Sequence, residues 1–165
     1  MSSEVHVTGL SDLQKLLDTL PVKLEKNIMR GALRAGMKVV LPVAAQNVHS
    51  VSGELAAGLK IGTRIKGRTV TARLMAKGPH GFVARWVEFG TAAHTISAKG
   101  GALSFGGIFA KSVEHPGATP HPFMRPALDQ TASAAVIAAA EYMKKRLATK
   151  ESLDVSDLVI EGDEP

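Results

Sequence analysis

Apolar residues recur every three or four positions in three segments of the chain, and this spacing predicts three helices. A short helix is expected over residues 11–20, with Ser11 as its N-cap. A second is expected over residues 22–48, although Pro42 lies inside it and should kink the helix or end it early. The third runs from Phe123 to about Thr149, roughly 40 Å at 1.5 Å per residue, and needs a packing partner along most of its length.

Between the second and third helices the pattern changes to alternation, which predicts strands. Residues 60–66 and 69–74 alternate apolar with basic or hydroxyl side chains around a turn at Gly67. They therefore predict a hairpin with one apolar and one basic face. The segment from Phe82 to Phe89 is expected to be a further strand, and Val5–Val7 a short strand before the first helix.

Residues 90–120 are rich in glycine and contain only short apolar pieces. Such a long segment between regular elements is usually functional or disordered, and we expect an extended β-hairpin or flexible arm at about 92–119. The expected fold is therefore α+β: a small antiparallel sheet packed against two or three helices, with a long extended β-hairpin arm and a long C-terminal helix. One domain is expected over residues 1–150, followed by an acidic tail at 151–165.

The composition narrows the class of protein. The 165 residues are 45% hydrophobic, enough for one domain with a packed core, and the chain has no cysteine, which excludes disulfides and thiolate chemistry. The chain contains no uninterrupted run of about 18 apolar residues, so no membrane span is expected. The first residues lack the profile of a signal peptide, so a cytoplasm-like compartment is expected.

The net charge of +5 is divided unevenly along the chain. Residues 1–150 contain 20 basic and 9 acidic residues, whereas the last fifteen contain six acidic residues and no basic one. The tail is expected to lie across a basic neighbour or to be a loose end. A solvated surface would explain the basic charge of residues 1–150, but the basic face of the hairpin could also contact nucleic-acid phosphates or an acidic protein surface. That face consists of Lys60, Arg64, Lys66, Arg68 and Arg73.

The sequence offers little catalytic or metal-binding chemistry. It contains no phosphate-binding loop, no zinc-protease motif and no nucleophile elbow, and its six histidines lack metal-ligand spacing. No cofactor, no metal and no enzymatic activity are therefore expected. Glu88 is the most conspicuous carboxylate, and we interpret it as an edge charge or as an ion-pair partner of Arg85 rather than as a catalytic group.

Three segments together resemble a known family. They are Val7–Leu13, then Phe82–Thr91 with its Val-Glu-Phe-Gly-Thr end, then the run from Val113 into Pro122-Phe123-Met124-Arg125-Pro126-Ala127-Leu128. This order resembles the head–tail joining and tail-completion proteins of long-tailed phages, the phage morphogenesis family that includes relatives of minor tail protein Z. The resemblance covers roughly residues 5–148 and leaves the acidic tail outside.

The resemblance implies a non-enzymatic virion protein of the neck, assembled in the host cytoplasm without membrane contact. Its implied partners are copies of itself in a six-fold or twelve-fold ring, the head-completion or connector protein, and the tail-tube or tail-terminator protein, with non-specific DNA contact in the channel. Phe123 would anchor the last helix to the sheet. The implied subunit-interface and arm residues are Glu88, Phe89, Gly90, Thr91, His94, Ile96, Leu103, Phe105, Phe109, Phe123 and Arg125.

Three other interpretations remain open at the level of sequence. A tail-terminator ring is the nearest, because it is also a small α+β ring. A basic nucleic-acid-binding module is the second, although aromatic residues are not interleaved with basic ones as stacking requires. The third is a small hydrolase that would use Glu88, His94 and His121.

Overall fold

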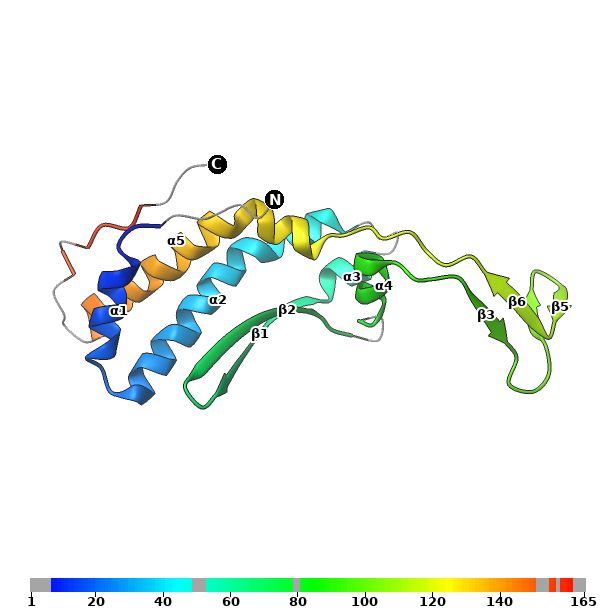
Figure 1. Cartoon of the computed structure of the whole chain (residues 1–165), viewed down its shortest axis with the longest axis horizontal. Helices are drawn as coiled ribbons and strands as arrows, with labels where there is room; N and C mark the ends of the chain where they lie inside the picture. The colour runs from blue at the N-terminus through cyan, green and yellow to red at the C-terminus, as the bar shows by residue number, and fades with distance from the viewer. Residues whose placement is uncertain (1–6, 49–52, 79–80, 151–154, 157, 162–165) are drawn as a thin grey trace.

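The computed structural model of the chain describes residues 7–48, 53–78, 81–150, 155–156 and 158–161. Within these residues the fold is α+β, with five helices and three two-stranded antiparallel sheets (Figure 1). The predicted fold class is therefore confirmed.

Two long helices, α2 (Val22–Asn47) and α5 (Met124–Lys150), pack side by side and form the axis of the body (Figure 1). They approach closely because α2 has a glycine where it crosses the small residues of α5. A Cβ atom on Gly36 would lie 2.6 Å from the carbonyl oxygen of Ala135. Each helix thus supplies the packing partner that the length of the other requires.

The core is divided into two clusters along this helix pair. The first joins α2 and the C-terminal half of α5 to α1 (Leu10–Asp18), which begins after Gly9 without the predicted Ser11 cap. Its buried side chains are Leu13, Leu17, Ile28, Ala32, Ala140, Met143, Leu147 and Leu158. The second, at the other end, is formed by Val40, Ala44, Leu55, Leu59, Ala84, Phe123 and Ala127.

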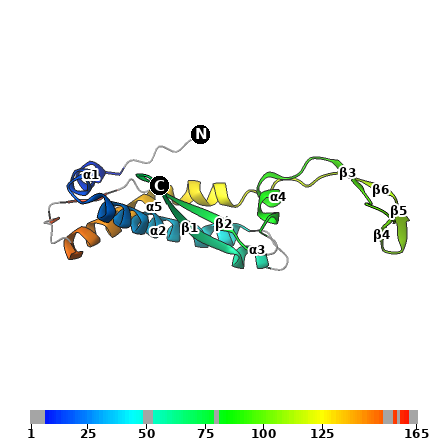
Figure 2. The ribbon, with the colours of Figure 1, turned by 90° about the horizontal axis from the view of Figure 1, so that it is seen from below.

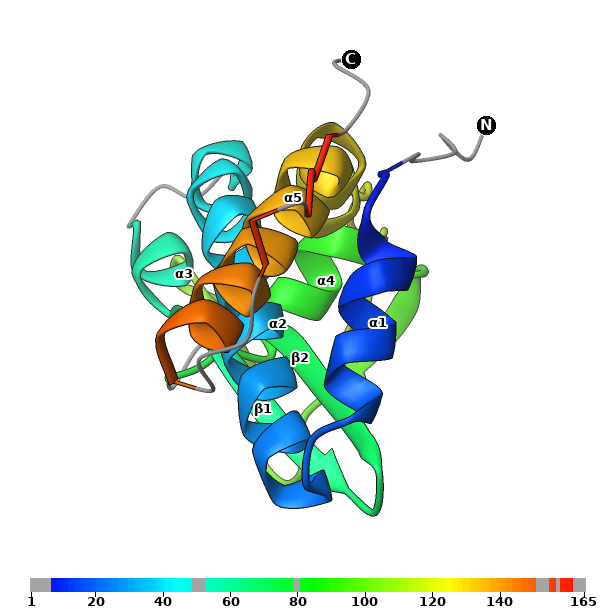
Figure 3. The same cartoon turned by 90° about the vertical axis from the view of Figure 1, so that its left-hand side faces the viewer.

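Leu158 shows that part of the predicted acidic tail belongs to the body. Its side chain is buried in the first cluster, and its carbonyl oxygen accepts a hydrogen bond from Lys144 Nζ. The backbone N–H of Thr8 donates to the carbonyl oxygen of Glu161 at 2.9 Å. Residues 155–156 and 158–161, here called the C-terminal segment, therefore lie against their own chain beside α1 and α5 (Figure 3).

The predicted hairpin is confirmed as β1 (Leu59–Lys66) and β2 (Thr69–Ala76), preceded by the short helix α3 (Glu54–Ala57). The register runs from Leu59 opposite Ala76 to Lys66 opposite Thr69, and both strands pack on α2. The inward positions are apolar or hydroxylic, as alternation predicts.

The expected strand at residues 82–89 is wrong: Val83–Phe89 form the helix α4. Aromatic and β-branched residues favour a strand, but burial here follows the helical period, with Ala84 and Glu88 inside and Phe82, Trp86 and Phe89 outside. The sheet formed by β1 and β2 therefore has two strands.

Two further expectations concern Pro42 and the segment Val5–Val7. Pro42 does not end its helix, because α2 continues to Asn47 with the proline at an exposed position. The strand expected at Val5–Val7 falls almost wholly outside the described residues.

The predicted arm is confirmed as an extended β structure that projects from the body next to α4 (Figures 1 and 2). Its shaft pairs β3 (His94–Ser97) with β6 (Ser112–His115). Its tip pairs β4 (Leu103–Phe105) with β5 (Ile108–Ala110). The tip lies at the far end of the arm from α4, as Figures 1 and 2 both show.

Candidate functional site

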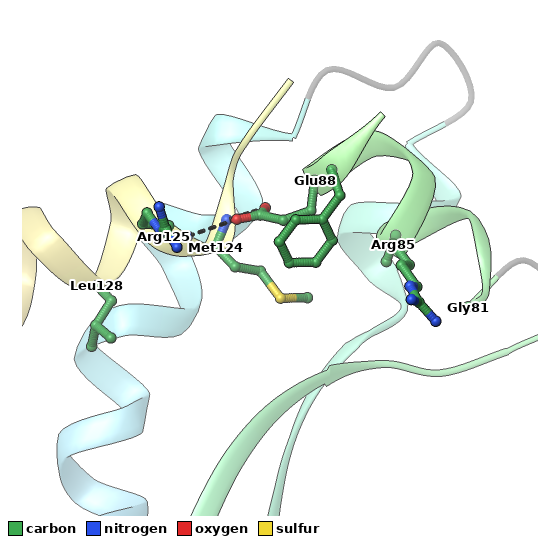
Figure 4. Close-up of a pocket in the computed structure, with 8 residues that line it drawn as sticks. Gly81, Arg85, Glu88, Met124, Arg125 and Leu128 are labelled. Carbon is green, nitrogen blue, oxygen red and sulfur yellow. Dashed lines mark hydrogen bonds between the residues drawn. The ribbon is translucent and has the colours of Figure 1, made fainter. Parts of the chain in front are cut away.

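The root of the arm is fixed by Glu88, which caps α5 from a different helix (Figure 4). The backbone N–H groups of Phe123 and Met124 donate to Glu88 Oε2 at 2.8 and 2.9 Å, and that of Arg125 donates to Oε1 at 3.1 Å. The first N–H groups of a helix have no acceptor within the helix, so both oxygens satisfy donors that would otherwise be buried. The expected ion pair with Arg85 is replaced by this cap, because a buried carboxylate needs several donors.

The charge of Glu88 is favoured in this position. Burial removes water from the carboxylate and by itself raises its pKa. The three backbone donors, together with the positive charge of Arg125, oppose this effect and leave the pKa of Glu88 below its ordinary value. The residue is thus a charged structural cap, and its two oxygens are already occupied.

Gly90 and Thr91 set the direction in which the arm leaves α4. Gly90 has φ of 69°, and a Cβ atom there would lie 2.5 Å from the carbonyl oxygen of Ala118. The N–H of Thr91 donates to Ala118 at 2.9 Å, and the N–H of Ala118 donates back at 3.1 Å. The two legs of the arm are therefore joined where they leave the body.

The arm shaft carries a cross-strand histidine pair. His94 lies opposite His115, with the ring centroids 5.1 Å apart. His94 Nδ1 is 2.9 Å from the carbonyl oxygen of Ala92, and His115 Nδ1 accepts the N–H of Gly117 at 3.0 Å. Each ring therefore contacts backbone two residues away, where the shaft continues toward the body.

Each residue considered for hydrolysis has a structural partner of its own. The Glu88 oxygens bind the start of α5, and the His94 ring faces His115. The His121 ring lies next to Thr119 Oγ1, at 3.3 Å. The described residues contain no cluster of three or more histidine and acidic side chains suited to a metal ion.

Most aromatic side chains of this protein are on its surface. The chain has five phenylalanines, one tryptophan and one tyrosine. Large apolar side chains are usually among the most buried, so these exposed residues are candidates for a contact surface. The exposed fractions are 57% for Phe82, 51% for Trp86, 69% for Phe89, 47% for Phe105 and 72% for Phe109.

Three of these aromatics line the outer side of α4. The rings of Phe82 and Trp86 pack edge to face with centroids 5.0 Å apart, and Phe89 follows at the end of the helix. Phe89 also lines a pocket of about 450 Å³. Met124, Arg125 and Leu128, which are labelled in Figure 4, line the same pocket. Phe89 is one of the predicted interface residues, whereas Phe82 and Trp86 are not. Only a helix places all three on one outer side, because in a strand Phe82 and Trp86 would face away from Phe89.

The other two exposed aromatics lie on the arm tip. Ile96, in the shaft, is also 36% exposed. The tip residues Leu103, Phe105 and Phe109 were predicted as arm residues, whereas Ile108, which is 70% exposed, was missed. Only the pairing of β4 with β5 shows that Ile108 lies directly opposite Phe105.

A second pocket, of about 360 Å³, runs between α2, α5 and β2. All its lining side chains are apolar, and Leu128, which is 50% exposed, also lines the pocket beside α4. We call it the α2–α5 groove. Residues on its wall include Leu33, Met37, Ala72, Leu128, Ala132 and Val136.

The basic hairpin face is also present. The outward side of the hairpin carries four exposed basic residues. They are Lys60, Arg64 and Lys66 on β1, and Arg73, which lies opposite Gly62, on β2. Arg68 lies in the turn, with its Nη2 4.0 Å from Glu25 Oε2. The hairpin thus holds its positive charges on one open surface.

Two predicted interface residues lie inside the body. Phe123 is fully buried in the second core cluster with Leu59 at the start of β1, and Glu88 is 8% exposed. Burial leaves neither side chain a surface to offer to a neighbouring subunit. Arg125 is exposed on the first turn of α5.

In the described part of the chain, no helix combines the length and the apolar character needed to cross a membrane.

Comparison of the chain with family models, with curated proteins and with solved structures finds no match.

Proposed function

We propose that this protein is a structural subunit of a phage neck, forming a ring that joins the head connector to the tail tube. One observation carries the proposal: five aromatic side chains are exposed, all of them on α4 or on an arm that leaves the body. Such a surface suits a protein whose neighbours complete it. The resemblance of its Val87–Thr91 and Pro122–Leu128 segments to tail-completion proteins supplies the phage context.

The exposed arm tip supports an assembled state. Its residues Phe105, Ile108 and Phe109 are 47%, 70% and 72% exposed and lie outside both core clusters. A ring subunit has two interfaces, and exposed apolar side chains suit such contacts.

The basic hairpin face is assigned to the DNA passage or to an acidic partner ring. DNA has to slide past a neck protein during ejection, so diffuse positive charge suits this position better than base-specific contacts. Lys60, Arg64, Lys66 and Arg73 provide such charge on an open two-stranded surface.

A tail-terminator ring is the nearest alternative and would use the same surfaces. A basic nucleic-acid-binding module is the alternative from another class, and the hairpin face favours it. That module would bind DNA as an isolated monomer, with affinity that falls steeply as salt rises. Absence of measurable DNA binding by the monomer would count against it.

The first experiment removes the distal arm without disturbing its root. Ile96 and Val113 are direct cross-strand partners, so residues 97–112 are replaced by Asn-Gly, a two-residue hairpin turn. We expect the shortened protein to remain monomeric by sedimentation and particles to fail to join tails to heads. Closed rings in electron micrographs and normal joining would refute a role for the arm.

The second experiment reverses the charge of the hairpin face by changing Lys60, Arg64, Lys66 and Arg68 to glutamate. We expect infectivity and DNA retention to fall while the protein still folds, since these side chains are exposed. A two-site version, Lys60→Glu with Arg64→Glu, is matched by Lys23→Glu with Lys145→Glu on the helices. Equal infectivity of the unchanged protein and all three variants would exclude the hairpin face from the mechanism.

A further inference from the structure

One face of the arm tip is entirely apolar. In an antiparallel pair, directly opposed residues point to the same side, and so do residues two positions apart. The pairs Leu103–Ala110 and Phe105–Ile108 therefore share a face, while Ser104 and Phe109 share the other. Phe105 and Ile108 are 47% and 70% exposed, so this face, here called the tip face, is open to solvent.

The α2–α5 groove has the chemistry and the size to receive the tip face. Its wall is apolar from Leu128 to Met143, about 22 Å along α5 at 1.5 Å per residue. A cavity of about 150 Å³ suffices to bind one benzene molecule. The groove, at about 360 Å³, thus has room for the ring of Phe105 together with the side chain of Ile108.

Within one copy the two surfaces are held apart. The arm leaves the body beside α4, and its tip is the part farthest from α1 (Figures 1 and 2). The paired legs and the Gly90 turn fix this direction. Each leg of the arm has about 14 residues, or roughly 45 Å when extended, which matches the length of the body helix α5. The arm is therefore long enough to reach across a second body.

From these observations we infer that the tip face of one copy docks in the α2–α5 groove of a second copy. The inference rests on the proposed ring and names its subunit contact. Donor and acceptor surfaces differ, so the contact is heterologous and passes from copy to copy, as ring closure requires. It also covers the side chains of Phe105 and Ile108, which a lone subunit leaves exposed.

Cysteine cross-linking tests the contact directly, because the chain has no cysteine of its own. Ile108→Cys protein is mixed with a second protein carrying cysteine at Leu128, Ala132 or Val136, three groove positions about one turn apart. A disulfide needs Cβ atoms about 4 Å apart, so we expect at least one pair to cross-link about fivefold more than the matched Phe109→Cys pairs. Phe109 lies on the opposite face of the same hairpin.

Surface variants test the energetic weight of the contact. Phe105→Ser with Ile108→Ser should raise the protein concentration needed for half assembly at least about tenfold, as expected for central apolar contacts. Ser104→Ala, on the opposite face of the same hairpin, should leave it unchanged within about twofold. All three residues are exposed, so the monomer keeps its fold, which circular dichroism checks.

The outcomes separate this inference from the ring itself. Rings that form without selective cross-linking from Ile108 refute the groove contact and leave the proposed ring standing. Selective cross-linking in open chains, without closed rings, supports the contact and refutes the ring. If neither appears at the highest soluble concentration, both are refuted.

Discussion

Glu88 is the residue whose role differs most from its appearance in the sequence. A lone carboxylate beside Phe89 and Gly90 suggests an edge charge or a functional acid. In the fold it binds three backbone N–H groups at the start of α5, 35 residues or more along the chain. It thereby joins α4, which begins the arm, to the helix that follows the arm.

This cap predicts a pH-dependent stability. The pKa of Glu88 is lowered in the folded protein, so its contribution is complete above the ordinary value of about 4.3 and is lost as pH falls through the lowered folded value. Glu88→Gln keeps one acceptor but loses the charge, and we expect a cost of about 1–3 kcal/mol at pH 7. Urea unfolding at pH 7 and at decreasing pH measures it.

The matched control is Glu141→Gln, at an exposed position on α5. It should change the free energy of unfolding by less than about 0.5 kcal/mol. If the stability of the Glu88→Gln protein falls as steeply with acid as that of the unchanged protein, Glu88 is not the group responsible.

The helix pair α2–α5 depends on glycine for its close approach. Gly36 faces the backbone of α5, whereas a Cβ atom on Gly31 would meet the ring of Tyr142. Backbone moves only with its whole helix, but a side chain changes rotamer. The two positions therefore differ in what an added methyl group displaces.

We expect Gly36→Ala to destabilise the protein by about 1–2 kcal/mol, because overpacking outweighs the gain in helix propensity of about 1 kcal/mol. Gly31→Ala should cost less, since Tyr142 can move. Thermal unfolding of the two variants compares them. Equal or higher stability of Gly36→Ala would show that the helices separate without cost.

Leu158 is the buried side chain by which the C-terminal segment joins the first core cluster. Leu158→Ala should cost about 2–5 kcal/mol because it removes a buried side chain from the first core cluster. Val159, its neighbour, is 59% exposed, and Val159→Ala should cost less than about 0.5 kcal/mol. Denaturant titration distinguishes them, and equal small effects would mean that the segment does not pack in solution.

In the whole molecule, the body and the arm are stabilised by different interactions. The body has two core clusters, whereas the arm is held by strand pairing and by its root. An isolated hairpin is marginally stable in water. The arm therefore gains its full order where another surface covers it.

This difference predicts that the arm can be removed without loss of body stability. The protein with Asn-Gly in place of residues 97–112 should unfold at a temperature within about 2 °C of the unchanged protein, because both core clusters remain. Calorimetry on monomeric samples measures this. A drop of about 8 °C or more would show that the arm supports the body.

Elements with local signals could be predicted from the pattern of residues along the chain. Helical spacing located α2 and α5, alternation located the β1–β2 hairpin with its basic face, and glycine content located the arm. These features depend on residues a few positions apart, so the pattern is sufficient to reveal them.

Features that depend on distant partners could not be predicted from local patterns. Residues 83–89 became a helix whose Glu88 caps α5, Leu158 entered a core built by α1, α2 and α5, and the groove arose from α2, α5 and β2. Each requires segments far apart in the chain to meet. The contact of Glu88 with the start of α5, the place of Leu158 in the core and the groove all form only when the chain packs. The spacing of residues along one segment therefore cannot predict them.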